Sequence, residues 1–142
     1  MKVNAELNWK GGMAFDAEVD GHIIPLDADA TVGGSDAGPR PKKLLLVALG
    51  GCTSMDIVSI LKKMRVEVEK FSVEVESSQT EDEHPYVYEF FKLIFRFEEK
   101  GLEAEAEKIQ KAVALSHDRY CGVSAMLSKS APVTYEIKIN GK

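Results

Sequence analysis

The chain has 142 residues, of which 44% are hydrophobic and 29% are charged, and its formal net charge is −5. This composition is that of an ordinary globular protein, and the length suits one domain with its own core, so residues 1–142 are predicted to form a single domain. The negative charge argues against a nucleic-acid-binding protein, because such a protein needs a basic face.

The N-terminus lacks the apolar run of a secretory signal peptide, so a cytoplasmic location is expected. The longest apolar stretch, residues 44–61, is interrupted by small and polar residues that make it a poor membrane span, and no membrane association is expected. The interrupting residues are Gly50, Gly51, Thr53, Ser54 and Asp56.

The first part of the chain is predicted to be an antiparallel meander of three strands. Hydrophobic residues alternate with polar ones over residues 2–9, which predicts a half-buried strand. The turn signals Lys10-Gly11-Gly12 and Asp20-Gly21 separate it from further strands at residues 13–19 and 22–26. Residues 27–39, rich in Gly, Ala, Asp and Ser, are predicted to form a loop.

The rest of the fold is predicted to be built around residues 38–65. Residues 44–49 contain no polar side chain, which predicts a helix buried in a core or an interface. Gly50 and Gly51 are expected either to break this helix or to let another backbone approach closely. A second helix, capped by its first threonine or serine, is then predicted over residues 53–64.

Cys52 would lie at or just before the first turn of that second helix. Unsatisfied backbone N–H groups and the helix dipole favour a thiolate over a thiol at such a position. The alternative is that Cys52 is a small apolar core residue, which is the usual role of a lone buried cysteine. The stretch alone leaves both interpretations open.

After residue 65 the hydrophobic period changes from that of a helix to that of a strand. The predicted elements are strands at residues 66–77 and 86–97, an amphipathic helix at 102–116, a short helix that begins near Cys121 or Val123 and ends by Lys129, and a strand at 133–139. This order of elements predicts an α+β fold with antiparallel sheet.

The candidate chemistry rests on Cys52 and Cys121. They are too few for a disulfide framework and too far apart in sequence for a local metal clip, so no metal site and no cofactor are expected. No phosphate-binding loop, dinucleotide fingerprint or zinc-protease motif occurs. Each cysteine follows the end of a predicted helix, which suggests a peroxidatic and a resolving thiol. His117 could pair with Cys121, but it also suits a helix C-terminus, which is the favoured interpretation.

Two segments resemble the cysteine motifs of the OsmC/Ohr family, the osmotically induced and organic hydroperoxide resistance proteins. The first is PKKLLL, residues 41–46, followed by ALGGC, residues 48–52, and by Met55-Asp56; the second is residues 116–127. The order of elements also agrees, so the resemblance covers nearly the whole chain. It implies antiparallel sheets wrapped around two central cysteine-bearing helices in an intertwined homodimer, with active sites at the subunit interface.

The resemblance also implies an activity, the thiol-dependent reduction of organic hydroperoxides or of a similar small apolar substrate. Cys52 would be the peroxidatic cysteine and Cys121 the resolving one. A dithiol reductant, such as one of the lipoyl type, would regenerate the pair. Oxidative-stress defence would be the biological role.

Two departures from the family pattern concern activation of the thiol. Characterised peroxidases of the family carry a glutamate directly after the proline that begins the first helix, whereas Lys42 follows Pro41 here. They also carry an arginine in the preceding loop, and residues 30–34 contain none. Arg40 and Lys42 are the candidate residues for activating the thiolate or binding substrate. The chain resembles a less characterised branch with GPRP and LGGC signatures.

These departures leave two alternatives to a peroxidase. One is a non-catalytic protein on the same scaffold that binds a small hydrophobic or thiol-bearing ligand in an interfacial apolar pocket. The other is a stress-related dimer whose cysteines are only packed in the core. A low thiol pKa and rapid oxidation at Cys52 would favour the enzyme over both. Arg119, beside the second motif, is interpreted as a surface residue.

Overall fold

The computed structural model describes residues 1–142, and their α+β fold confirms the predicted class. The chain forms two compact units, Met1–Leu45 and Leu46–Lys142. Each unit contains one three-stranded sheet. The single domain expected over the whole chain stays a prediction.

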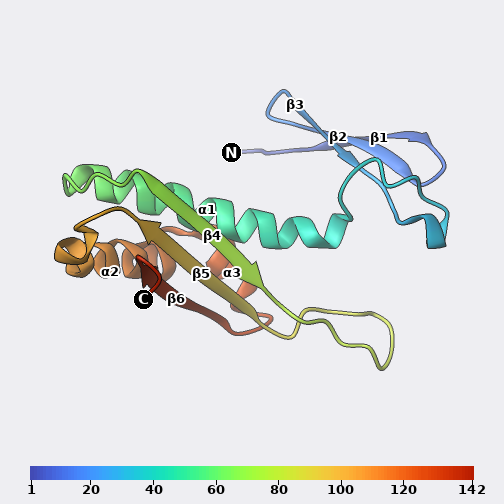
Figure 1. Ribbon diagram of the computed structural model, residues 1–142. Helices are drawn as coiled ribbons and strands as arrows, with labels where there is room; N and C mark the ends of the chain where they lie inside the picture. The colour runs from blue at the N-terminus through green and yellow to red at the C-terminus, as the bar shows by residue number, and fades with distance from the viewer. The chain divides into compact units, whose positions relative to one another are not determined.

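The first unit contains the predicted meander of β1 (Glu6–Gly11), β2 (Ala14–Val19) and β3 (His22–Leu26) (Figure 1). All neighbouring strands are antiparallel, in the order β1-β2-β3. The expectation that the first strand is half-buried is wrong for this chain by itself, because every residue of β1 is exposed. Trp9, for example, is 67% exposed, since no second layer of the same unit covers the sheet.

A buried carboxylate organises the loop that follows β3. The side chain of Asp27 accepts hydrogen bonds from the backbone N–H groups of Ala28 (2.7 Å), Ser35 (3.1 Å) and Ala37 (3.1 Å). These bonds, that of Ala28 first, hold the pKa of Asp27 below its ordinary value. The predicted loop is therefore ordered around one residue, and it also contains a 3-10 turn, η1 (Ala30–Val32).

The central helix, α1 (Leu44–Lys63), is continuous and follows a 3-10 turn, η2 (Pro41–Lys43). The predicted break at Gly50 and Gly51 is therefore wrong. The other prediction for these glycines was the close approach of another backbone; at Gly50 it is a side chain that approaches, since a Cβ atom there would lie 3.0 Å from Cγ2 of Val75. Gly50 thus lets α1 pack tightly against the neighbouring sheet.

The same helix, with its preceding turn, is long and apolar enough by length and composition to cross a membrane. The core helix of a soluble protein passes this test too, so the helix is weak evidence for a membrane span. In this chain Leu49, Ile57 and Leu61 of α1 are buried in the hydrophobic core.

The sheet of the second unit consists of β4 (Lys70–Glu76), β5 (Phe91–Glu98) and β6 (Val133–Ile139). β4 is antiparallel to β5 as predicted, but β6 is parallel to β5, so the sheet is mixed. The reason is that the chain between β5 and β6 crosses back over the sheet through helices. Both long predicted strands are shorter in the structure, because residues 66–69 and 86–90 lie outside them.

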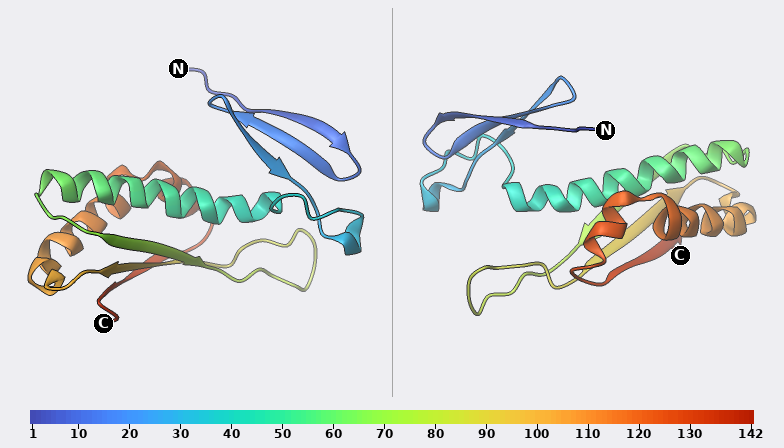
Figure 2. Two further views of the ribbon diagram at one scale, coloured as in Figure 1. Left: turned by 45° about the horizontal axis from the view of Figure 1, so that its top comes forward. Right: turned by 180° about the vertical axis from the view of Figure 1, so that it is seen from behind.

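The crossover between β5 and β6 contains four helical elements. They are η3 (Leu102–Glu105), α2 (Ala106–Leu115), a π-helical turn η4 (Ser116–Tyr120) and α3 (Gly122–Leu127). The predicted amphipathic helix and the predicted short helix are confirmed. Figures 1 and 2 show α1, α2 and α3 on one face of the sheet of the second unit.

The two faces of this sheet differ in chemistry. The face that meets the helices is apolar, and one of its cross-strand rows, for example, joins the hydrophobic residues Val73, Phe95 and Ile137. The opposite face carries ion pairs, including Lys92–Glu136 at 2.9 Å. Because both α1 and the crossover pack on the apolar face, they lie close enough to share a site.

Candidate active site

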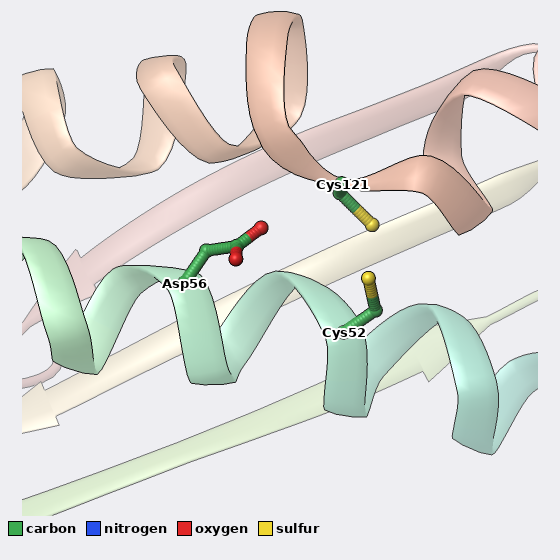
Figure 3. Close-up of side chains that lie close together, drawn as sticks. All are labelled: Cys52, Asp56 and Cys121. Carbon is green, nitrogen blue, oxygen red and sulfur yellow. The ribbon is translucent and has the colours of Figure 1, made fainter. Parts of the chain in front are cut away.

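Three side chains from two parts of the second unit meet above the sheet. The sulfur atoms of Cys52 and Cys121 and a carboxylate oxygen of Asp56 all lie within 4.8 Å of one another (Figure 3). Cys52 and Asp56 are one turn apart on α1, so they share a face of the helix. Cys121 comes from the junction of η4 and α3. Both cysteines are free thiols.

Cys52 lies inside α1, so the prediction that it starts a helix is wrong. The predicted cap is also absent, since the Thr53 hydroxyl donates instead to the carbonyl of Leu49 at 2.9 Å, a bond within the same helix. The unsatisfied N–H groups of a first helical turn are therefore not available to the Cys52 thiol. Its side chain is half-buried and packs against the hydrophobic core.

Cys121 has the helix-start position that was predicted for Cys52. It is the N-cap of α3, and its Sγ accepts a hydrogen bond from the backbone N–H of Ser124 at 3.3 Å. Its own N–H donates to the carbonyl of Ser116 at 2.9 Å. Cys121 is only 3% exposed. The short helix predicted to begin near this residue is confirmed.

The thiol of Cys121 is held in its protonated form. Burial, and next the hydrogen bond to Cys52, raise the pKa of Cys121 from its ordinary value of 9.0 to about 11. The backbone N–H groups of Ser124 and Val123 oppose this rise without cancelling it. Cys121 is therefore a thiol at neutral pH, and its S–H can donate to the sulfur of Cys52.

Ser116 connects the two cysteine-bearing segments. Its hydroxyl lies 3.1 Å from the carbonyl oxygen of Thr53 and 3.1 Å from Oδ2 of Asp56, and it can donate its proton to either. Its own carbonyl accepts the N–H of Cys121. Ser116 is 1% exposed, so these bonds form in a dry environment. One residue thus fixes η4 to α1 beside both thiols.

Ser116 and Asp56 were not among the site residues predicted from sequence. A usable signal existed for Asp56, because it is the only charged residue between Leu44 and Leu61 and lies four positions after Cys52. Ser116 is the first residue of the second cysteine motif, but nothing in the sequence indicated its contacts, which join segments far apart in the chain.

A cavity of about 340 Å³ adjoins Cys121, and its lining residues include His117, Asp118, Arg119 and Lys129. His117 packs its ring edge-on against Tyr135, with 5.1 Å between ring centroids, and its buried Nδ1 has no hydrogen-bond partner. Arg119 is exposed, as expected for a surface residue.

An apolar groove of about 410 Å³ lies between α1 and β4. Its lining residues are Leu46, Val47, Gly50, Gly51, Val73 and Val75. The groove therefore reaches Gly51, the residue directly before Cys52. It is the nearest counterpart in this unit to the apolar slot expected beside the peroxidatic thiol.

The two candidate cations, Arg40 and Lys42, belong to the first unit. The guanidinium of Arg40 forms ion pairs with Asp36 and with Asp29, the latter at 3.3 Å. These carboxylates, Asp36 first, raise the pKa of Arg40. Lys42 lies in the 3-10 turn before α1. A role for either residue at Cys52 stays a prediction.

Known proteins resemble this chain along most of its length. The family model for OsmC-like proteins matches residues 33–136, which include both cysteines. Protein YhfA of Escherichia coli strain K12 is 33% identical over 138 residues, which cover 96% of this chain and 98% of YhfA.

Solved structures of other proteins have the same fold over nearly the whole chain. A hypothetical protein from Aquifex aeolicus has 28% identity and a TM-score of 0.77, with 98% of each chain covered. The organic hydroperoxide resistance protein OhrB of Bacillus subtilis has 21% identity and a TM-score of 0.67, with 95% of this chain and 98% of OhrB covered. At that identity the likeness to OhrB is one of fold.

Proposed function

This chain belongs to the OsmC-like protein family, and from that premise we propose that it reduces organic hydroperoxides through Cys52 and Cys121. The observation that carries the proposal is the pair of free thiols brought together from α1 and from the junction of η4 and α3. One relative of the same fold, OhrB of Bacillus subtilis, is named for organic hydroperoxide resistance, which supports the choice of substrate class.

The surroundings of the two thiols support different roles for them. Cys52 is half-buried, whereas Cys121 is almost fully buried, so a substrate reaches Cys52 more easily. The raised pKa of Cys121 keeps its proton on sulfur. That S–H can stabilise negative charge on the Cys52 sulfur by hydrogen bonding. Cys52 is therefore proposed as the peroxidatic thiol and Cys121 as the resolving thiol.

The proposed reaction proceeds in two steps. The thiolate of Cys52 attacks the terminal oxygen of the hydroperoxide, the O–O bond breaks, and the alkoxide takes up a proton to leave as an alcohol. Cys52 is then a sulfenic acid. The sulfur of Cys121 attacks it, losing its proton, and water leaves as the disulfide forms. An external dithiol, proposed to be of the lipoyl type, reduces the disulfide and restores both thiols.

The proposal includes a homodimer in the cytoplasm. Several large apolar side chains of α1 remain uncovered in the single chain, with Val47 65%, Met55 76% and Val58 55% exposed. Monomeric proteins rarely leave such a row of apolar side chains in contact with water. A second copy of the chain packed along α1 would cover them.

A second candidate function is the non-catalytic binding of a small hydrophobic or thiol-bearing ligand. The observation that favours it is the lack of an activating cation. No cation contributes to the pKa of Cys121, and Arg40 is already paired with Asp29 and Asp36. The apolar groove beside Gly51 would accept such a ligand.

Stopped-flow oxidation of the reduced protein distinguishes the two functions. A peroxidase should react faster with an organic hydroperoxide, such as cumene hydroperoxide, than with hydrogen peroxide. Peptide mapping should then find a disulfide between Cys52 and Cys121. A rate no better than that of free cysteine, with no such disulfide, would contradict the peroxidase and favour the binding protein.

A further inference from the structure

We propose that Cys52, Asp56 and Cys121 also form a binding site for a thiophilic divalent metal ion of the zinc type. The reaction proposed above has a use for the two thiols but none for Asp56. Asp56 accepts a hydrogen bond from Ser116, and its carboxylate also lies within 4.8 Å of both sulfurs, which places three metal-ligating groups together.

The spacing of the three donor atoms suits a tetrahedral metal. Two sulfurs bound to zinc at about 2.3 Å are separated by roughly 3.8 Å in tetrahedral geometry. The three donor atoms here already lie within 4.8 Å of one another, so only small side-chain movements are needed to bring them onto one ion. Cys52 and Asp56 supply two of the donors from adjacent turns of one continuous helix, a rigid base for a site.

The ligand chemistry favours zinc-type ions over magnesium or calcium. Thiolate sulfur binds zinc well, whereas magnesium and calcium take oxygen ligands. Two thiolates and one carboxylate carry three negative charges, which a divalent cation compensates in large part. Three protein ligands leave the fourth tetrahedral position for water, as in catalytic zinc sites.

The residues around the donors provide the support that metal ligands need. The hydroxyl of Ser116 can donate to Oδ2 of Asp56 at 3.1 Å, and the N–H of Ser124 donates to Sγ of Cys121 at 3.3 Å. Such outer hydrogen bonds orient ligands and typically strengthen metal binding by about 10- to 100-fold. Cys121 also borders the cavity of about 340 Å³ described above, so one of the three donors adjoins open space.

Metal binding and disulfide formation would compete for the same two sulfurs. On binding, each thiol loses a proton to solvent, and neither the metal nor the sulfur changes oxidation state. Oxidation of the pair to a disulfide removes two of the three ligands. A bound ion would therefore protect the reduced thiols, and oxidation would release it.

The test is metal binding by the reduced full-length protein, with no hydroperoxide present. Zn²⁺ is titrated in competition with a chromophoric chelator, and Co²⁺ is added separately to look for thiolate-to-cobalt charge-transfer absorption. We expect each chain to bind one Zn²⁺ ion, and the Co²⁺-loaded protein to show the charge-transfer absorption. C52S, C121S and D56N should each weaken binding by at least about tenfold, since a direct ligand matters no less than its outer-shell partners.

Two controls make the result specific. E107Q removes an exposed carboxylate on α2 that is not one of the three donors, and it should leave the affinity unchanged. Protein oxidised beforehand with diamide, which forms disulfides without any peroxidase activity, should not bind. Circular dichroism of each variant verifies that it is folded.

Absence of the cobalt absorption, or binding that C52S or C121S leaves intact, would overturn the metal site. An unchanged affinity in D56N would overturn the three-donor arrangement. Because the readout is independent of turnover, a protein that binds zinc but reduces no hydroperoxide would refute the proposed function alone. A protein that reduces hydroperoxides but binds no zinc would refute only the metal site.

Discussion

The two cysteines meet at one site but are held there in different ways. Cys52 is fixed inside a continuous helix that packs on the sheet, and its backbone groups are used within that helix. Cys121 lies where a π-helical turn ends and a helix of six residues begins. Its backbone is extended at this point, with φ −77° and ψ 104°.

This difference indicates which thiol has to move. A disulfide requires two sulfurs about 2.05 Å apart, with constrained Cβ positions. Moving Cys52 would disturb a helix whose close contact with β4 depends on Gly50, whereas Cys121 lies at a junction between short elements. We therefore expect α1 to stay in place and the segment around Cys121 to adjust when the disulfide forms.

The largest effect should come from removing one thiol at a time. C52S should lose the reaction with organic hydroperoxide entirely, because Cys121 is buried and protonated. C121S should still react once and stop at a sulfenic acid on Cys52, which a dimedone label followed by mass spectrometry detects. If C52S reacted and C121S did not, the proposed roles would be reversed.

A second prediction concerns the stability of the protein in alkali. Since folding raises the pKa of Cys121 from 9.0 to about 11, the native state holds its proton more tightly than the unfolded chain does. This contribution to stability is complete below pH 9.0 and is lost as the pH rises towards about 11. One group can change the unfolding free energy by at most about 1.4 kcal/mol per pH unit.

Urea denaturation at several pH values across that window measures the effect. C121S is the control, because serine does not titrate there and its stability should fall less steeply with pH. Equal slopes in both proteins would show that Cys121 is not the responsible group.

A third prediction tests the connection between the two segments. S116A removes the hydroxyl that contacts Asp56 and the carbonyl of Thr53, and it should cost about 1–3 kcal/mol of unfolding free energy because those acceptors are buried. Disulfide formation should also slow, since η4 is no longer bound to α1 beside the thiols.

Ser128 provides a matched control for this change. Its hydroxyl also donates to a backbone carbonyl, that of Ala125 at 3.1 Å, but the residue is exposed. S128A should therefore change stability by less than about 0.5 kcal/mol. If chemical denaturation showed that S116A and S128A lose similar amounts of unfolding free energy, Ser116 would have no special role.

The smallest effect is expected from the two adjacent glycines of α1. G51A should stabilise the chain by about 0.5–1 kcal/mol, because alanine is the better helix former and its Cβ meets nothing within 4 Å. G50A should lose that gain, because its Cβ would lie 3.0 Å from Val75. Thermal denaturation compares the pair, and a destabilised G51A would indicate another chain packed on that face.

Local pattern was enough to predict most elements but not how they join. The meander, the amphipathic helix and the last strand follow from periodicity and turn residues. The break at Gly50 and Gly51 was wrong because glycine's low helix propensity is outweighed here by tertiary packing against β4. The parallel pairing of β6 with β5 depends on the path of the crossover, which strand patterns do not specify.

The candidate site was also predictable only in part, because local pattern identifies residues but not the tertiary contacts that bring them together. The two cysteine motifs singled out Cys52 and Cys121, and the structure brings their sulfurs together. The position of Cys52 in its helix was wrong because the helix does not restart there. The contacts of Ser116 join residues sixty or more positions apart, and such pairs leave no mark in a single sequence.

The parallel arrangement of β6 beside β5 has a kinetic consequence. Cys121 belongs to the crossover that links these two strands, and such non-local pairing forms slowly because a long loop must close first. We expect the two thiols to remain apart in partly folded chains and to meet only when the last strand completes the sheet. In a refolding experiment, the rate at which an oxidant links Cys52 to Cys121 would then report the closing event of the whole second unit.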